Sequence, residues 1–98
     1  MNYQVIIQPE AEAELDDAYE YLNGVRPNLG FDFLELVADV VEQLETNPHQ
    51  FQKVYQEKRR AIIQRFQYNV IYKIIKQEVF ILAIIHGSRN PERWQSRG

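Results

Sequence analysis

A run of seven consecutive apolar residues at positions 79–85 constrains the fold of this chain more than any other feature of its sequence. A strand with one face in water alternates polar and apolar side chains, whereas a strand covered on both faces is apolar throughout. The run therefore predicts a strand in the interior of a sheet. A chain of 98 residues has room for one such core, so we expect a single domain over residues 1–98.

Further extended segments precede this run. Three segments are rich in β-branched and aromatic side chains and predict consecutive antiparallel strands. They are residues 61–66, 70–75 and 79–85. We expect the turns between them at residues 67–69 and 76–77, although neither has the favoured Asn-Gly or Asp-Gly pair. Residues 3–8 predict one more strand at the start of the chain.

The residues between the first two predicted strands have helical periodicity. Pro9 is favoured at the first position of a helix, and the apolar spacing behind it predicts a helix over residues 9–22. A tight turn at residues 23–27 leads to a second helix, for which Asn28 is the expected N-cap. The apolar stripe of that helix is Phe33, Val37, Val40, Val41 and Leu44. The predicted fold is α+β, with the order β-α-α-β-β-β and an antiparallel sheet packed against a helical hairpin.

Charge is distributed unevenly along the chain. Residues 1–50 carry eleven Asp and Glu and one Arg, a net charge of −10, whereas residues 51–98 carry ten Lys and Arg and three Glu, a net charge of +7. A basic half of this kind can attract polyanions or an acidic partner. The simpler interpretation is that acidic helices offset a basic sheet within one fold.

Several classes of site are not expected. The chain has no cysteine, and His49 and His86 lie far apart in sequence, so neither a zinc site nor a thiol nucleophile is predicted. A glycine-rich phosphate loop is absent from the sequence, and we expect no cofactor. The first residues lack the pattern of a secretion signal, and no apolar run approaches the length of a membrane span. We therefore expect a cytoplasmic protein without a membrane partner.

Three groups of residues are distinctive when taken in order. They are the start with Tyr3, Val5, Pro9, Ala11 and Leu15, the segment 60–72 with Tyr68-Asn69-Val70-Ile71-Tyr72, and the ending Ile85-His86-Gly87-Ser88-Arg89-x-Pro91-x-x-Trp94. In order and spacing they resemble the RelE/ParE toxins of bacterial toxin–antitoxin systems. The resemblance spans nearly the whole chain, and the His-Gly-x-Arg ending is its most specific part.

This resemblance implies a growth-arresting toxin of a plasmid-stabilisation module, neutralised by a cognate antitoxin protein that wraps it. RelE-like members cut messenger RNA on the ribosome, as mRNA interferases, whereas ParE-like members poison DNA gyrase. The ending here is more typical of the ParE-like branch. Arg89 matches an arginine of the RelE active site, but Asn69 stands where RelE has a second arginine. DNA gyrase is therefore the favoured partner, and the ribosome with its mRNA is the alternative. A homodimer and a toxin–antitoxin hetero-oligomer both remain open.

If the chain is a ribonuclease, its catalytic candidates are His86, Arg89 and Arg65. An imidazole can move a proton near neutral pH, and the planar guanidinium of an arginine can hold a phosphate. The alternative for His86 is a structural imidazole at the end of a strand, hydrogen-bonded to a neighbouring loop. The sequence alone does not decide whether the protein is an enzyme.

A target-binding surface has its own candidates. They are Arg89, Arg93, Trp94, Arg60 and Tyr68. For Tyr68 the commoner role of an aromatic residue in a meander is core or cross-strand packing. Trp94 is also a candidate anchor for residues 86–94, which predict an ordered loop after the last strand. The basic run at residues 58–60 has the character of a solvated turn.

Overall fold

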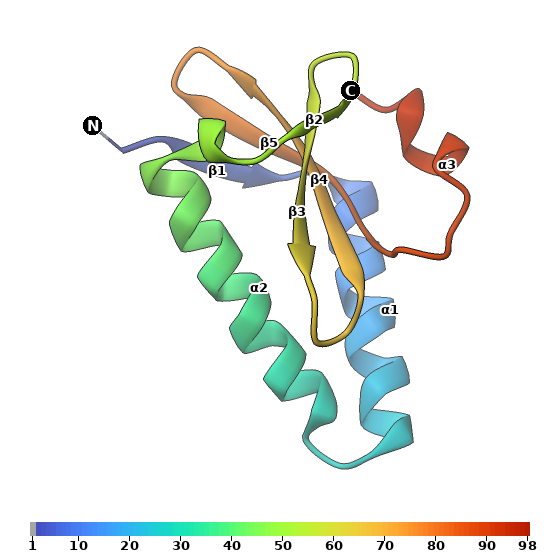
Figure 1. Ribbon diagram of the computed structural model, residues 1–98. Coiled ribbons are helices and arrows are strands. Elements are labelled where there is room, and N and C mark those ends of the chain that lie inside the picture. The colour runs from blue at the N-terminus through green and yellow to red at the C-terminus, as the bar shows by residue number, and fades with distance from the viewer. Residues whose placement is uncertain (1) are drawn as a thin grey trace.

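The computed structural model describes residues 2–98, and its α+β architecture confirms the predicted fold class. The elements are β1 (Gln4–Ile7), α1 (Pro9–Val25), α2 (Leu29–Thr46), the 3-10 turn η1 (Pro48–Gln50), β2 (Lys53–Tyr55), β3 (Lys58–Ile63), β4 (Tyr68–Ile75), β5 (Glu78–His86) and α3 (Glu92–Gln95). Figure 1 shows α1 and α2 side by side as a helical hairpin, with α3 apart from them near the C-terminus. The short elements β2, η1 and α3 were not expected from the sequence.

The sheet has the strand order β1-β5-β4-β3-β2. Strands β3, β4 and β5 form the predicted antiparallel meander, and β5 lies in the interior between β1 and β4. Strand β1 pairs with β5 in parallel, so the sheet is mixed rather than antiparallel throughout. Two helices and three strands separate β1 from β5, so no tight hairpin forces these two strands to run in opposite directions.

The main core lies between the sheet and the two long helices, as the helical stripes predict. Its largest fully buried side chains include Phe33 and Leu44 of α2 and Tyr72 of β4. The opposite side of the sheet, which we call the outer face, carries a second and smaller core. Its buried members are Ile71, Ala83, Ile85 and Trp94. Because β5 contributes to both cores, its run of apolar residues is explained.

The start of α2 is fixed by a close approach to α1. A Cβ on Gly30 would lie 2.4 Å from the backbone oxygen of Tyr19, so no larger residue fits without movement of the backbone. The Gly30 N–H donates to Oδ1 of Asn23 at 2.8 Å. Asn28 does hold the N-cap position, but its φ is 70° and its side chain makes no capping bond, so the expected cap is corrected. Asn23 satisfies the helix start instead.

The boundaries of β3 and β4 differ from those expected. Strand β3 begins at Lys58, so the basic run that we expected in a solvated turn is part of the sheet. Only 8% of Lys58 is exposed, and its Nζ donates to the backbone oxygen of Gln95 at 3.1 Å. The turn falls at residues 64–67, where Gln67 has a φ of 57°. Tyr68 therefore opens β4 and packs against Phe33, with ring centroids 4.8 Å apart.

The segment after β5 is held on the outer face, as the anchoring interpretation of Trp94 predicts. Trp94 is only 6% exposed and packs edge to face against Tyr55, with ring centroids 6.2 Å apart. One turn of helix, α3, forms within the segment that we expected to be a loop. We call residues 87–98 the tail. Within residues 2–98, no helix has the length and apolar character needed to cross a membrane.

Candidate functional site

A cleft of about 500 Å³ lies between α1 and the C-terminal end of β5. We call it the α1–β5 cleft. Its lining residues are Glu14, Asp17, Ala18 and Tyr21 of α1, Tyr68 of β4, Ile84, Ile85 and His86 of β5, and Ser88, Arg89 and Arg93 of the tail. Four of the sequence-predicted site residues, namely Tyr68, His86, Arg89 and Arg93, are therefore brought together here.

His86 ends β5 and is fixed on two sides. Its Nδ1 accepts a hydrogen bond of 3.1 Å from the backbone N–H of Ser88 and lies 2.8 Å from the Ser88 hydroxyl oxygen. The neutral ring then carries its proton on Nε2, a tautomer inferred from these partners. The imidazole also packs edge to face on Tyr68. Both contacts fit the structural interpretation of His86.

Arg89 and Arg93 place positive charge along the tail side of the cleft. The backbone N–H of Arg89 donates to the His86 oxygen at 3.0 Å, which closes the turn that leads out of β5. Among residues 2–98 neither guanidinium takes part in an ion pair. Asp17 and Glu14 lie on the α1 side of the same cleft, so its two walls have opposite charge.

The electrostatics of Tyr68 reflect this arrangement. Burial raises the pKa of the Tyr68 phenol above its ordinary value, and the positive charge of Arg89 partly offsets that rise. A phenol is protonated at neutral pH even at its ordinary pKa, so the Tyr68 hydroxyl can donate a hydrogen bond into the cleft that it lines.

The remaining predicted residues lie elsewhere. Arg65, in the turn between β3 and β4, pairs with Asp32 of α2 at 3.3 Å and lies over the Phe66 ring. Arg60 lines a shallower depression of about 480 Å³ together with Asn69. This depression lies on the outer face, because Ala61 belongs to the helix-side core and side chains alternate along a strand. The structure thus does not gather Arg60 or Arg65 into the cleft.

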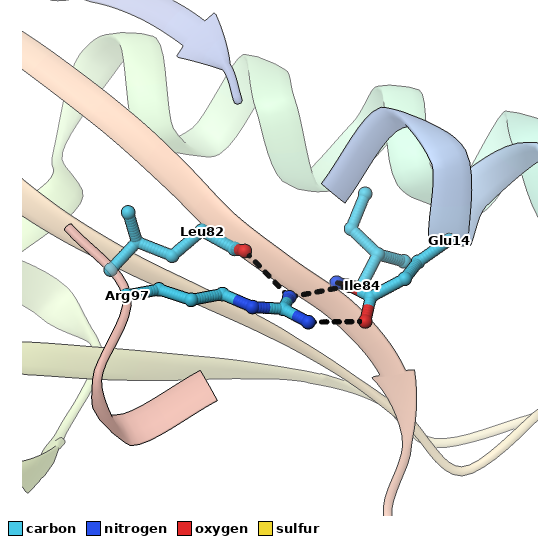
Figure 2. Close-up of polar contacts among 4 residues, drawn as sticks. All are labelled: Glu14, Leu82, Ile84 and Arg97. Carbon is cyan, nitrogen blue, oxygen red and sulfur yellow. Dashed lines mark hydrogen bonds and ion pairs between the residues drawn. The ribbon is translucent and has the colours of Figure 1, made fainter. Parts of the chain in front are cut away.

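Two residues that no sequence pattern singled out, Glu14 and Arg97, form a two-point ion pair, and Glu14 also lines the cleft. Figure 2 shows the guanidinium of Arg97 facing the carboxylate of Glu14, with N–O distances of 3.0 and 3.1 Å. They are 83 positions apart, so no local pattern could have paired them. Among the described residues, no group of three or more His, Asp or Glu side chains is placed to hold a metal ion.

A family model described as the ParE toxin of the type II toxin–antitoxin system parDE matches residues 5–91. The chain belongs to the ParE toxin family. This membership confirms the resemblance given by the sequence, and the matched residues run from within β1 to the turn before α3.

Individual relatives agree with this assignment. This chain is 25% identical over 92 residues to toxin ParE2 of Mycobacterium tuberculosis. The aligned residues cover 93% of this chain and 88% of ParE2. Solved structures share its fold. A chain of the chromosomal ParDE system of P. aeruginosa superposes with a TM-score of 0.75 at 17% identity, over 86% of this chain and 95% of that one. The isolated E. coli RelE toxin gives a TM-score of 0.57 at 17% identity, over 93% and 90%.

Proposed function

We propose that this ParE-family toxin arrests bacterial growth in the cytoplasm by binding and inhibiting DNA gyrase. The observation that carries the proposal is the position of Arg89 and Arg93, which line the α1–β5 cleft and form no ion pair among residues 2–98. Arginine is enriched among the residues that dominate binding energy at protein interfaces. Two such cations beside a concave, partly apolar surface suit the binding of an acidic protein segment.

A second candidate function is ribosome-dependent cleavage of messenger RNA. His86 and Arg89 both line the cleft, which supports it. A cleavage site also needs further cations for the charge that develops on phosphorus. Arg65 is paired with Asp32, and Asn69 stands on the outer face in place of an arginine. We therefore favour the gyrase inhibitor.

The test of the proposed surface is a titration of gyrase supercoiling with purified toxin. Truncation of an interface arginine that dominates binding costs about 2 kcal/mol or more, so Arg89→Ala should raise the half-inhibitory concentration by roughly 30-fold. Arg65→Ala is the matched control, because it removes an arginine of the same half of the chain outside the cleft. Equal inhibition by both variants would contradict the assignment of Arg89.

We further propose that a cognate antitoxin covers part of the outer face and the tail. The depression beside Arg60 contains Ile62, which is 48% exposed, and the half of the chain that forms it has a net charge of +7. An acidic amphipathic segment that folds on binding would find both apolar and cationic contacts there.

The position of the antitoxin can be measured by hydrogen exchange of the toxin with and without its partner. We expect protection of β3, β4 and the tail. Protection confined to α1 and α2 would refute this placement.

A further inference from the structure

The ion pair between Glu14 and Arg97 is mostly shielded from solvent. The two side chains are 14% and 18% exposed, and both guanidinium NH₂ nitrogens contact the carboxylate, one to each oxygen. A planar guanidinium that meets a carboxylate in this two-point manner fixes direction as well as distance. The two residues belong to α1 and to the tail, so the pair joins segments from opposite ends of the chain.

The pair also occupies the open edge of β5. Strand β1 follows β5 only as far as Ile81, where Gln8 N–H donates to the Ile81 oxygen, so the rest of that edge has no strand beside it. Figure 2 shows Arg97 donating to the Leu82 oxygen at 3.0 Å and Glu14 accepting from the Ile84 N–H at 3.1 Å. Side chains thus satisfy backbone groups that a neighbouring strand would otherwise pair with. We call this set of contacts the tail clasp.

The tail clasp fixes the C-terminal end of the tail after the tail has crossed the outer face of the sheet. After His86 the chain passes to the outer face, where Trp94 is buried and Lys58 holds the Gln95 oxygen. At Arg97 it returns to the edge of β5 and binds α1, which covers the other face. Arg89 and Arg93 lie in the tail between His86 and Arg97, and they line the cleft opposite the helix that carries Glu14.

We propose that Glu14 and Arg97 are positioning residues that hold the tail so that Arg89 and Arg93 face the α1–β5 cleft in their target-binding arrangement. This inference rests on the proposed function, in which those arginines contact gyrase. Glu14 itself lines the cleft, so Arg97 has a second effect: it neutralises a carboxylate that would otherwise attract Arg89 and Arg93 across the same cleft. Without the clasp the tail samples other positions, and apparent affinity falls in proportion to the fraction that remains competent.

The test compares Arg97→Gln with Arg65→Gln in the full-length toxin. Both variants break an ion pair between an arginine and the helical hairpin, but Arg65 pairs with Asp32, away from the tail. Trp94 is the chain's single tryptophan, so its fluorescence reports the tail selectively, while far-ultraviolet circular dichroism reports the whole fold. Supercoiling by gyrase and growth arrest in cells are measured on the same variants.

We expect Arg97→Gln to shift the Trp94 emission to longer wavelength and to weaken inhibition about tenfold. A tenfold loss corresponds to about one tenth of the molecules holding the tail in its target-binding arrangement. Arg65→Gln should leave both quantities unchanged. Native emission with native inhibition in Arg97→Gln would overturn the proposal, and so would a shifted emission with full inhibition.

A double variant separates positioning from simple stability. Loss of one partner of a shielded pair leaves an uncompensated charge, which can unfold the protein, whereas Glu14→Gln with Arg97→Gln leaves none. We expect the double variant to melt near the native temperature and yet inhibit weakly, because the two-point contact is gone. Recovery of native inhibition together with stability would show a structural role only and would refute the proposal.

The failure of the proposed function gives a different pattern. If the native toxin arrests growth without inhibiting gyrase, the gyrase assignment is wrong, and the clasp is then judged by Trp94 emission and growth arrest alone. Loss of growth arrest together with the emission shift in Arg97→Gln still supports the clasp. Unchanged growth arrest overturns it.

Discussion

The rings of Tyr68 and His86 meet edge to face at directly paired positions of β4 and β5, with centroids 5.4 Å apart and planes at 88°. Both side chains line the α1–β5 cleft. Together with the bond from Ser88 N–H to Nδ1, it fixes the imidazole at the point where the chain leaves the sheet.

Replacement of His86 by alanine should therefore affect stability more than target binding. We expect a loss of about 1 kcal/mol from the aromatic contact and the hydrogen bond, and half-inhibition of gyrase within about threefold of the native value. Urea unfolding and a supercoiling titration measure the two effects. A folded His86→Ala variant that has lost 100-fold or more in activity would instead indicate proton transfer by this residue.

The two glycines of the helical hairpin should respond oppositely to the same substitution. At Gly30 a methyl group would collide with the Tyr19 backbone oxygen, so Gly30→Ala should destabilise the fold by about 1–3 kcal/mol. At Gly24, inside α1, a Cβ meets nothing within 4 Å, so Gly24→Ala should stabilise by about 0.5–1 kcal/mol. Thermal melts of the two variants test this, and a shift of the same sign in both would contradict the packing described.

Ionisation of Tyr72 makes the free energy of unfolding depend on pH in the alkaline range. Burial raises the pKa of its phenol to about 12, against the opposing charge of Arg59, and its hydroxyl donates to the Pro48 oxygen. In the unfolded chain the same phenol ionises near pH 10. The contribution of the neutral phenol to the stability of the folded state is therefore complete below pH 10 and is lost as pH rises toward 12. From these two pKa values, about 1.4 kcal/mol should be lost by pH 11.

The comparison with Tyr72→Phe isolates that effect, because all other groups titrate in both proteins. At pH 8 the native protein should be more stable by about 1 kcal/mol, the value of one hydrogen bond. By pH 11 the difference should vanish or reverse. Urea unfolding at both pH values measures it, and a difference that stays constant would contradict the raised pKa.

Periodicity predicted most of the fold because it records burial directly. The run at residues 79–85 is apolar throughout since β5 contributes to two cores, and the helical stripes match the buried faces of α1 and α2. The sequence did not indicate where β1 pairs or in which direction, because that contact forms between residues more than 70 positions apart. The cap of α2 was also missed, because Asn23 acts across the hairpin and not from the N-cap position.

The cleft was predictable only in part. The residues of the ending, His86 and Arg89, are close in sequence and remain close in space. The α1 wall of the cleft and the Glu14–Arg97 pair depend on tertiary contacts. No spacing rule links residues of α1 to residues of the tail that lie so far away in the sequence. Arg65 was a further catalytic candidate from the sequence, but its guanidinium pairs with Asp32 of α2.

Gyrase inhibition by this toxin is tested most directly by a pair of assays on one preparation of native toxin. One assay measures supercoiling by DNA gyrase, and the other maps cuts in messenger RNA on translating ribosomes by primer extension. We expect loss of supercoiling, or a trapped cleaved complex of gyrase with DNA, while ribosome-bound messenger RNA stays intact. Codon-positioned cuts that disappear in His86→Ala, with supercoiling unaffected, would contradict gyrase inhibition and make this toxin a ribonuclease.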